Sequence, residues 1–174
     1  MTALGAATAS STDEIAEGLE KFAAVSNTVG LSYEYATSAL ATVTATTRQS
    51  ADVVGTAFKT LFARIQDLEL GKTLDDGTTL GKYSQALDAV GVAIKTADGG
   101  LRDMDDILSD LGEKWNSLDA EGNPLISKDA KVALAQTVAG VRQYTQLMAL
   151  MDNWDFMKEN LETARNATGT LTEQ

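Results

Sequence analysis

The sequence has 174 residues, of which 44% are hydrophobic and 6% aromatic, and its formal net charge is −11. It contains no cysteine and no histidine, which excludes disulfides, cysteine nucleophiles and any metal site or catalytic base that needs an imidazole. The negative charge disfavours contact with phosphate backbones, so we expect no nucleic-acid recognition. An aliphatic, alanine-rich chain with a single proline is instead expected to form a helical core.

The beginning of the chain does not indicate export or membrane insertion. Residues 1–10 lack the basic region and the continuous apolar run of a signal peptide, and we interpret them as a flexible leader. No window of the sequence reaches about 18 consecutive apolar residues, so no membrane span is expected in this segment. These features predict a soluble chain made in a cytoplasm.

Capping residues mark the first two helices. Ser11 and Glu14 match a capping box, which predicts a helix over about 12–27 that stops at Gly30. Ser32 can cap a second helix. We expect that second helix to be weakened by its threonines, which are Thr42, Thr44, Thr46 and Thr47.

The third helix is the most regular in the sequence. Ser50 is its expected cap, and Asp52 falls in the first turn, where the helix dipole favours an acid. Its apolar residues form one helical face over about 51–68: Val54, Phe58, Leu61, Phe62, Ile65 and Leu68. The dipeptide Arg48-Gln49 precedes this helix and is echoed at Arg142-Gln143. We expect Arg48 to pair with an acid on another helix.

The middle of the chain is richer in glycine and acid. Residues 67–121 hold thirteen of the 25 acids and five of the 14 bases, and eight of the 14 glycines lie between 71 and 122. We expect loop-rich segments at 69–102 and 119–126, with short helices at about 80–90 and 103–118. The second of these helices carries Leu111 and Trp115 on its apolar face.

The last part of the chain predicts long helices. Ser127 can cap a helix through about 139, and after Gly140 an apolar run at helical spacing continues to about 167. Gly169 is expected to end it, with a frayed tail at 170–174. Its stripe is either core or an adaptable partner surface, and the small size of the chain favours core: Tyr144, Leu147, Met148, Met151 and Trp154.

Two groups of acidic residues are candidate cation sites. Asp119, Glu121 and Asn123 occupy the first, third and fifth positions of a calcium-loop pattern, but Pro124 replaces its glycine and Ala130 its bidentate Glu. These three residues are therefore at most a weak metal candidate. The other group is Asp103, Asp105, Asp106 and Asp110, which we interpret as a solvated helix N-terminus. No catalytic motif or cofactor-binding motif is present, so neither a catalytic activity nor a cofactor is expected.

The order of five segments resembles a known family. The segments are "TTRQSADVVGTAFKTLFARIQ" (46–66), the Gly/Asp-rich stretch after it, "LRDMDDILSDLGEKWNSL" (101–118), "LAQTVAGVRQYTQLMALMDNWD" (134–155) and "LETARNATGTL" (161–171). This succession is similar to the core region of tail tape measure proteins of long-tailed bacteriophages and prophages. The stretch "DAEGNPLI" (119–126) departs from it as a short insertion.

The resemblance implies a structural function. Such proteins set tail length, template the polymerisation of the tail tube and leave the tube with the DNA. The implied partners are the tail tube protein, tail assembly chaperones and other copies of the chain, and the implied location is the lumen of the virion tail after synthesis in the bacterial host cytoplasm. A rod of 174 helical residues would span only about 260 Å, so we expect a fragment of a longer chain.

The sequence thus predicts an all-α fold, either a helical bundle or an elongated array of about six helices with a less regular Gly/Asp-rich middle. One helical domain is expected over 11–169. The competing interpretations are a helical adaptor or secreted interaction module unrelated to tails, and, far less favoured, a hydrolase.

Overall fold

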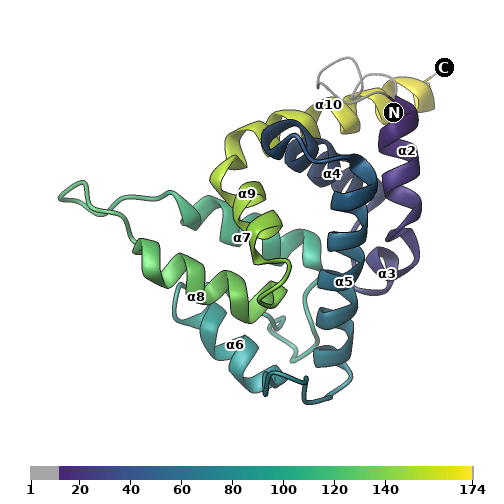
Figure 1. Ribbon diagram of the computed structural model, residues 1–174. Coiled ribbons are helices and arrows are strands. Elements are labelled where there is room, and N and C mark those ends of the chain that lie inside the picture. The colour runs from purple at the N-terminus through teal and green to yellow at the C-terminus, as the bar shows by residue number, and fades with distance from the viewer. Residues whose placement is uncertain (1–11, 174) are drawn as a thin grey trace.

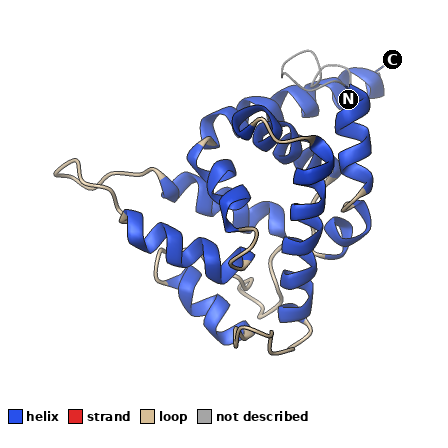
Figure 2. Cartoon of the chain, in the orientation of Figure 1, coloured by secondary structure: helices blue, strands red, loops and turns tan. Residues whose placement is uncertain are grey.

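The computed structural model describes residues 12–173, and within that range the regular structure is helical (Figure 2). The described residues form α2 (Thr12–Glu20), α3 (Ala23–Thr28), α4 (Tyr33–Thr47), α5 (Ala51–Glu69), α6 (Leu80–Asp88), α7 (Met104–Trp115), α8 (Lys128–Ala139), α9 (Tyr144–Asp152) and α10 (Trp154–Glu173). The predicted all-α class is confirmed. The leader and the Ser11 cap lie outside the described residues.

Helix α4 is the central element. Ten consecutive residues, Tyr35–Thr44, are buried, because α2, α3, α5, α9 and α10 all contact this helix (Figure 1). The helix begins at the predicted cap, where the Tyr35 N–H donates to Ser32 Oγ (3.2 Å). It runs unbroken through its threonines because their hydroxyls donate to carbonyls one turn earlier, as Thr42 does to Ser38 (2.7 Å).

Helix α5 begins and ends within one residue of its predicted bounds. The Val53 N–H donates to Ser50 Oγ (3.2 Å), as the capping pattern predicts. Its glycine has a function that the pattern did not show: Gly55 lies directly against the backbone of Gly18 in α2, and an added Cβ would be inside contact distance of the Gly18 carbonyl oxygen. The two helix backbones meet there without side chains between them.

Two helices that the sequence predicted as continuous are interrupted. The predicted helix 12–27 breaks after Glu20, which turns Phe22 into the core against Phe58 and Phe62, with ring centroids 5.4 and 6.1 Å apart. The run after Gly140 breaks at Asn153, whose side-chain amide donates to the Ala149 carbonyl (2.7 Å). With these two breaks, residues 12–173 form nine helices, more than the approximately six expected.

Other boundaries also differ from the prediction. The helix predicted at 80–90 ends at Asp88, and that predicted at 103–118 ends at Trp115. The last helix, α10, continues to Glu173, so Gly169 does not end it. Helix α5 packs on α8 and α9, whereas α10 packs mainly on α4.

A β-hairpin projects from the helical body between α7 and α8 (Figure 1). We call residues 116–127 the arm. Leu118 and Pro124 form an isolated antiparallel bridge, and the Leu125 N–H donates to the Ser117 carbonyl (2.9 Å). The arm contains residues 119–126, the stretch that departs from the tape measure resemblance as a short insertion.

Candidate interaction surfaces

The predicted packing face lies inside the molecule. Eleven of the thirteen residues that the spacing placed on apolar helix faces are buried in one hydrophobic core: Val54, Phe58, Leu61, Phe62, Ile65, Leu68, Leu111, Trp115, Leu147, Met151 and Trp154. The other two, Tyr144 and Met148, are partly buried and pack against the same core. The methionine and tryptophan stripe is therefore occupied by the chain itself, and surfaces for partners have to be sought elsewhere.

The two tryptophans tie α7 to the C-terminal helices. The Trp154 ring lies on Gly112, where an added Cβ would overlap the indole, and its Nε1–H donates to Glu113 Oε1 (3.1 Å). Trp115 Nε1–H donates to Asp152 Oδ1 (2.8 Å). The Trp154 hydrogen bond and then Lys158, 3.2 Å from Glu113, lower the pKa of the Glu113 carboxyl. Gly112 was not a predicted site residue, although a glycine inside a helical pattern is the signal for such a contact.

Arg64 holds three segments together. Its Nη2 donates to Thr78 Oγ1 and to the Thr137 carbonyl near the end of α8, both at 3.0 Å, and lies 2.9 Å from Asp76 Oδ2. The Arg64 side chain is largely buried, and its Nε atom has no hydrogen-bond partner among the described residues. Arg64 therefore connects the turn before α6 and the end of α8 to α5. Its partners are too distant in sequence for residue spacing to predict these contacts.

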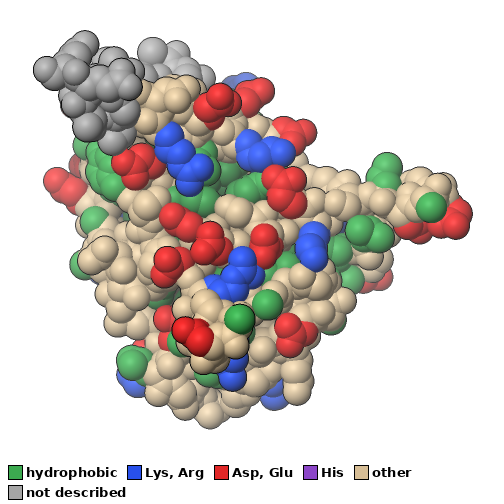
Figure 3. Space-filling view, turned by 180° about the vertical axis from the view of Figure 1, so that it is seen from behind, with side chains coloured by type: hydrophobic (Ala, Val, Ile, Leu, Met, Phe, Trp, Pro, Cys, Tyr) green, Lys and Arg blue, Asp and Glu red, His purple; other side chains and the backbone are tan. Residues whose placement is uncertain are grey.

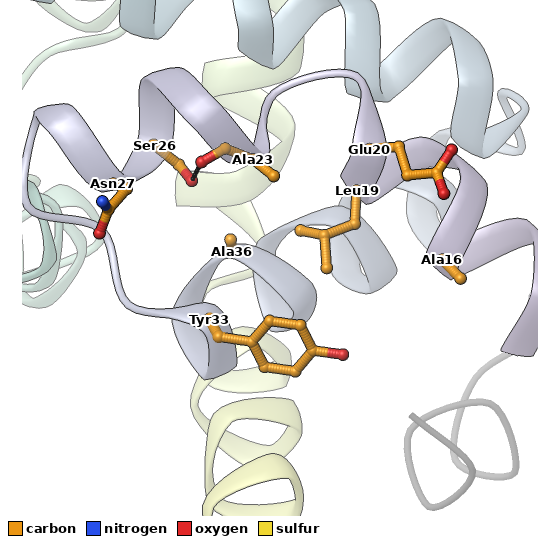
Figure 4. Close-up of a pocket in the computed structure, with 8 residues that line it drawn as sticks. All are labelled: Ala16, Leu19, Glu20, Ala23, Ser26, Asn27, Tyr33 and Ala36. Carbon is orange, nitrogen blue, oxygen red and sulfur yellow. Dashed lines mark hydrogen bonds between the residues drawn. The ribbon is translucent and has the colours of Figure 1, made fainter.

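A shallow apolar groove of about 270 Å³ lies where α2, α3 and α4 meet (Figure 4). Its walls are small or aliphatic, with the half-exposed ring of Tyr33 along one side: Ala16, Leu19, Glu20, Ala23, Ser26, Asn27, Tyr33 and Ala36. The Ser26 hydroxyl donates to the Ala23 carbonyl (2.9 Å). Glu20 is the one charged side chain in its lining, so the groove offers apolar contact rather than chemistry.

A larger, more polar hollow of about 410 Å³ lies between α5 and the start of α9. We call it the α5–α9 cleft, lined by Asp52, Val53, Thr56, Ala57, Arg142, Gln143 and Gln146. The buried Gln146 donates from Nε2 to Gln49 Oε1 (3.2 Å). The two Arg-Gln dipeptides of the sequence, 48–49 and 142–143, are thus brought to one region of the molecule.

The expectation for Arg48 is wrong within residues 12–173. None of the ion pairs formed there involves Arg48. Its role is backbone geometry: it ends α4 in the left-handed region (φ 61°), and its N–H donates to the Thr44 carbonyl (3.0 Å). That turn allows the chain to take a new direction before Ser50 caps α5 two residues later.

The candidate cation residues are engaged locally. Asp119 Oδ1 accepts the N–H groups of Glu121 (2.9 Å) and Asn123 (2.8 Å), which closes the tip of the arm. In the described range no three acidic, histidine or cysteine residues converge as a metal site would require.

The second acidic group is divided among separate partners. Asp105 accepts the Ser32 N–H (3.1 Å) in front of α4, and burial raises the pKa of its carboxyl. Asp110 pairs with Arg102 (2.8 Å). These acids therefore serve to connect α7 to its neighbours.

Comparison with known proteins gives one family. The family described as phage-related minor tail protein matches residues 1–140, well over half of the chain. The chain belongs to this family. No solved structure matches it.

Membership in the minor tail protein family supports a structural role in a phage tail and association with the virion. The matched range contains α2 to α8 and ends at Gly140, so α9 and α10 lie beyond it. The α5–α9 cleft combines residues from both sides of that limit. Within residues 12–173, no helix has the length and apolar character needed to cross a membrane.

Proposed function

We propose that this chain is a segment of a tail tape measure protein, which sets the length of a phage tail, templates assembly of the tail tube and is released as DNA is ejected. The observation that carries the proposal is the match of residues 1–140 to the minor tail protein family. It is supported by the order of the five sequence segments that resemble tape measure cores. The proposal includes no catalytic role and no cofactor.

The proposed partners are the tail tube protein, tail assembly chaperones and other copies of the chain, and the proposed location is the lumen of the tail. The fold is compatible with a structural part, because most of the aromatic and methionine side chains among the described residues pack in its own core. The chain is acidic overall, with a net charge of −11, and acidic side chains lie across the face shown in Figure 3 among basic and hydrophobic ones. Such a surface has no attraction for DNA that passes it.

Tail length tests the proposal directly. In a phage that encodes this chain, the segment would be duplicated in frame and tails measured by electron microscopy. A segment that extends as a continuous helix adds about 260 Å to the tail, whereas one that keeps the compact fold adds considerably less. Either lengthening supports a tape measure role.

Unchanged tail length in assembled particles would overturn the tape measure role. A same-length insertion in another structural tail gene serves as the control, because it adds protein without adding to the ruler. The family assignment itself does not depend on this outcome.

A further inference from the structure

The arm presents an apolar and acidic tip that is exposed in the described part of the chain. Leu118 and Leu125 are 61% and 59% exposed, and Figure 3 shows hydrophobic atoms along the arm with acidic atoms at its end. Glu121 is exposed and takes part in no ion pair among residues 12–173. The Asp119 hydrogen bonds hold the tip in one shape, so little conformational entropy is lost when it binds.

The α5–α9 cleft has the complementary character. Arg142 is exposed on its wall and pairs with no acid among the described residues. The cleft's own acid, Asp52, is already 3.0 Å from Lys21. Val53 in the cleft and Val141 beside Arg142 are 48% and 66% exposed. Of the seven large hydrophobic side chains exposed in the described range, four belong to the arm or to this cleft and its edge.

We propose that the α5–α9 cleft of one copy receives the arm tip of a second copy, with Glu121 on Arg142 and the two leucines against the exposed valines. An arginine guanidinium can hold a carboxylate through two parallel hydrogen bonds, which gives the contact its register. Gln143, which is partly exposed on the cleft wall, supplies a further amide group for the backbone of the tip.

The positions of the two surfaces set the type of assembly. The arm projects to one side of the body, beyond α7 and α8, whereas α5 lies on the other side of those helices (Figure 1). Because the arm and the cleft lie on different sides of the body, one contact leaves an arm and a cleft free for further copies, and we expect a head-to-tail ring or open chain. The proposed tail role supplies a setting in which copies meet, but the contact is a property of the chain alone.

A charge exchange between two chains tests the contact. The full 174-residue chain, Arg142→Glu and Glu121→Arg would be studied separately by analytical ultracentrifugation over a concentration series. We expect the unaltered chain to self-associate, and each variant to do so at least about tenfold more weakly, since each places like charges together. A 1:1 mixture of the two variants should recover the original strength, because every contact between unlike chains then joins opposite charges.

Salt is not a useful variable here, because it screens the attractive pair and also relieves repulsion between two chains of charge −11. Lys95→Glu, an exposed change outside both surfaces, is the matched control and should associate like the unaltered chain. A monomer at every concentration would overturn the inference. So would association that neither variant weakens, or a mixture that stays as weak as its components. Each of these results leaves the tail-length experiment unaffected.

Discussion

Helices α4 and α5 are in contact, but they differ in how their side chains are buried. Helix α5 has one apolar face towards the core and an exposed polar face, whereas α4 is buried on every side over Tyr35–Thr44. The core side of α5 is filled by large side chains, while α4 is rich in alanine, serine and threonine. The comparison shows that polar composition does not mark a helix as peripheral when its hydroxyls are satisfied by its own carbonyls.

The largest effect is expected where α5 meets α2 without side chains. Gly55→Ala places a methyl group against the Gly18 carbonyl, and since backbone rather than a flexible side chain is in the way, we expect a loss of about 2–3 kcal/mol in the free energy of unfolding. Urea denaturation measures it. Gly81→Ala, in α6, is the matched control: only Thr79 Oγ1 lies near, at 3.8 Å, so helix propensity should stabilise the chain slightly. Equal effects of the two changes would contradict this account.

The next effect concerns the polar interior of α4. Thr42 Oγ1 accepts from Asn160 Nδ2 (2.9 Å) in α10, and both residues are buried. Thr42→Val removes the acceptor but keeps the volume, and the unpaired amide should cost about 1–2 kcal/mol of unfolding free energy. Thr46→Val, on the same helix but exposed, should change stability by less than about 0.5 kcal/mol. A Thr42→Val variant as stable as the parent would show that the buried hydrogen bond contributes nothing.

A pH effect is expected at the end of α5. Glu69 is half-buried near Asp103, and burial, then that neighbouring acid, raises the pKa of its carboxyl from the ordinary value of 4.5 to about 7. The folded chain therefore binds this proton more tightly than the unfolded chain, and stability falls as pH rises from about 4.5 to 7. Because the group is partly solvated, Glu69→Gln should add on the order of 1 kcal/mol at pH near 8 and almost nothing near pH 4.

Thermal unfolding across this pH range measures the difference, with Glu162→Gln, an exposed change on α10, as the control. A Glu69→Gln variant whose stability has the same pH dependence as that of the parent would contradict a raised pKa of the half-buried Glu69 carboxyl.

The smallest effect is expected between α4 and α5. Arg48 has a positive φ of 61°, which glycine adopts without steric cost. Arg48→Gly should therefore stabilise the chain by about 0.5–1 kcal/mol, whereas Arg48→Ala should be nearly neutral, because no ion pair is lost. Differential scanning calorimetry distinguishes the two. A clear loss of stability in Arg48→Ala would instead support the ion pair between Arg48 and an acid that the sequence suggested.

The same contrast explains what could be predicted from the sequence. The bounds of α5 followed from its spacing and from Ser50, because an amphipathic helix shows its buried face in its periodicity. The central position of α4 could not be seen, since a helix buried all round has no polar side to give a period. The breaks after Glu20 and at Asn153 carry no proline or glycine. They exist because Phe22 and Trp154 pack against distant partners.

The candidate surfaces were less accessible to prediction than the core. The repeated Arg-Gln dipeptide can be seen in the sequence. The hydrogen bond from Gln146 to Gln49 cannot be predicted from it, because the two residues are 97 positions apart. The calcium-loop pattern suggested a weak metal candidate at Asp119, whereas in the structure the Asp119 carboxylate accepts the backbone N–H groups of Glu121 and Asn123 in a turn. Residue patterns can indicate where the chain turns. That the turn at Asp119 projects from the body as the arm depends on how α7 and α8 pack, which the sequence does not show.

Native-state hydrogen exchange tests most directly whether α4 is the centre of the fold. Amides in the middle of α4 should exchange only through global unfolding, as slowly as the slowest amides of α5, whereas the first turn of α5 and the arm should exchange sooner. Exchange of α4 at the rate of a peripheral helix, with α5 still protected, would contradict the account.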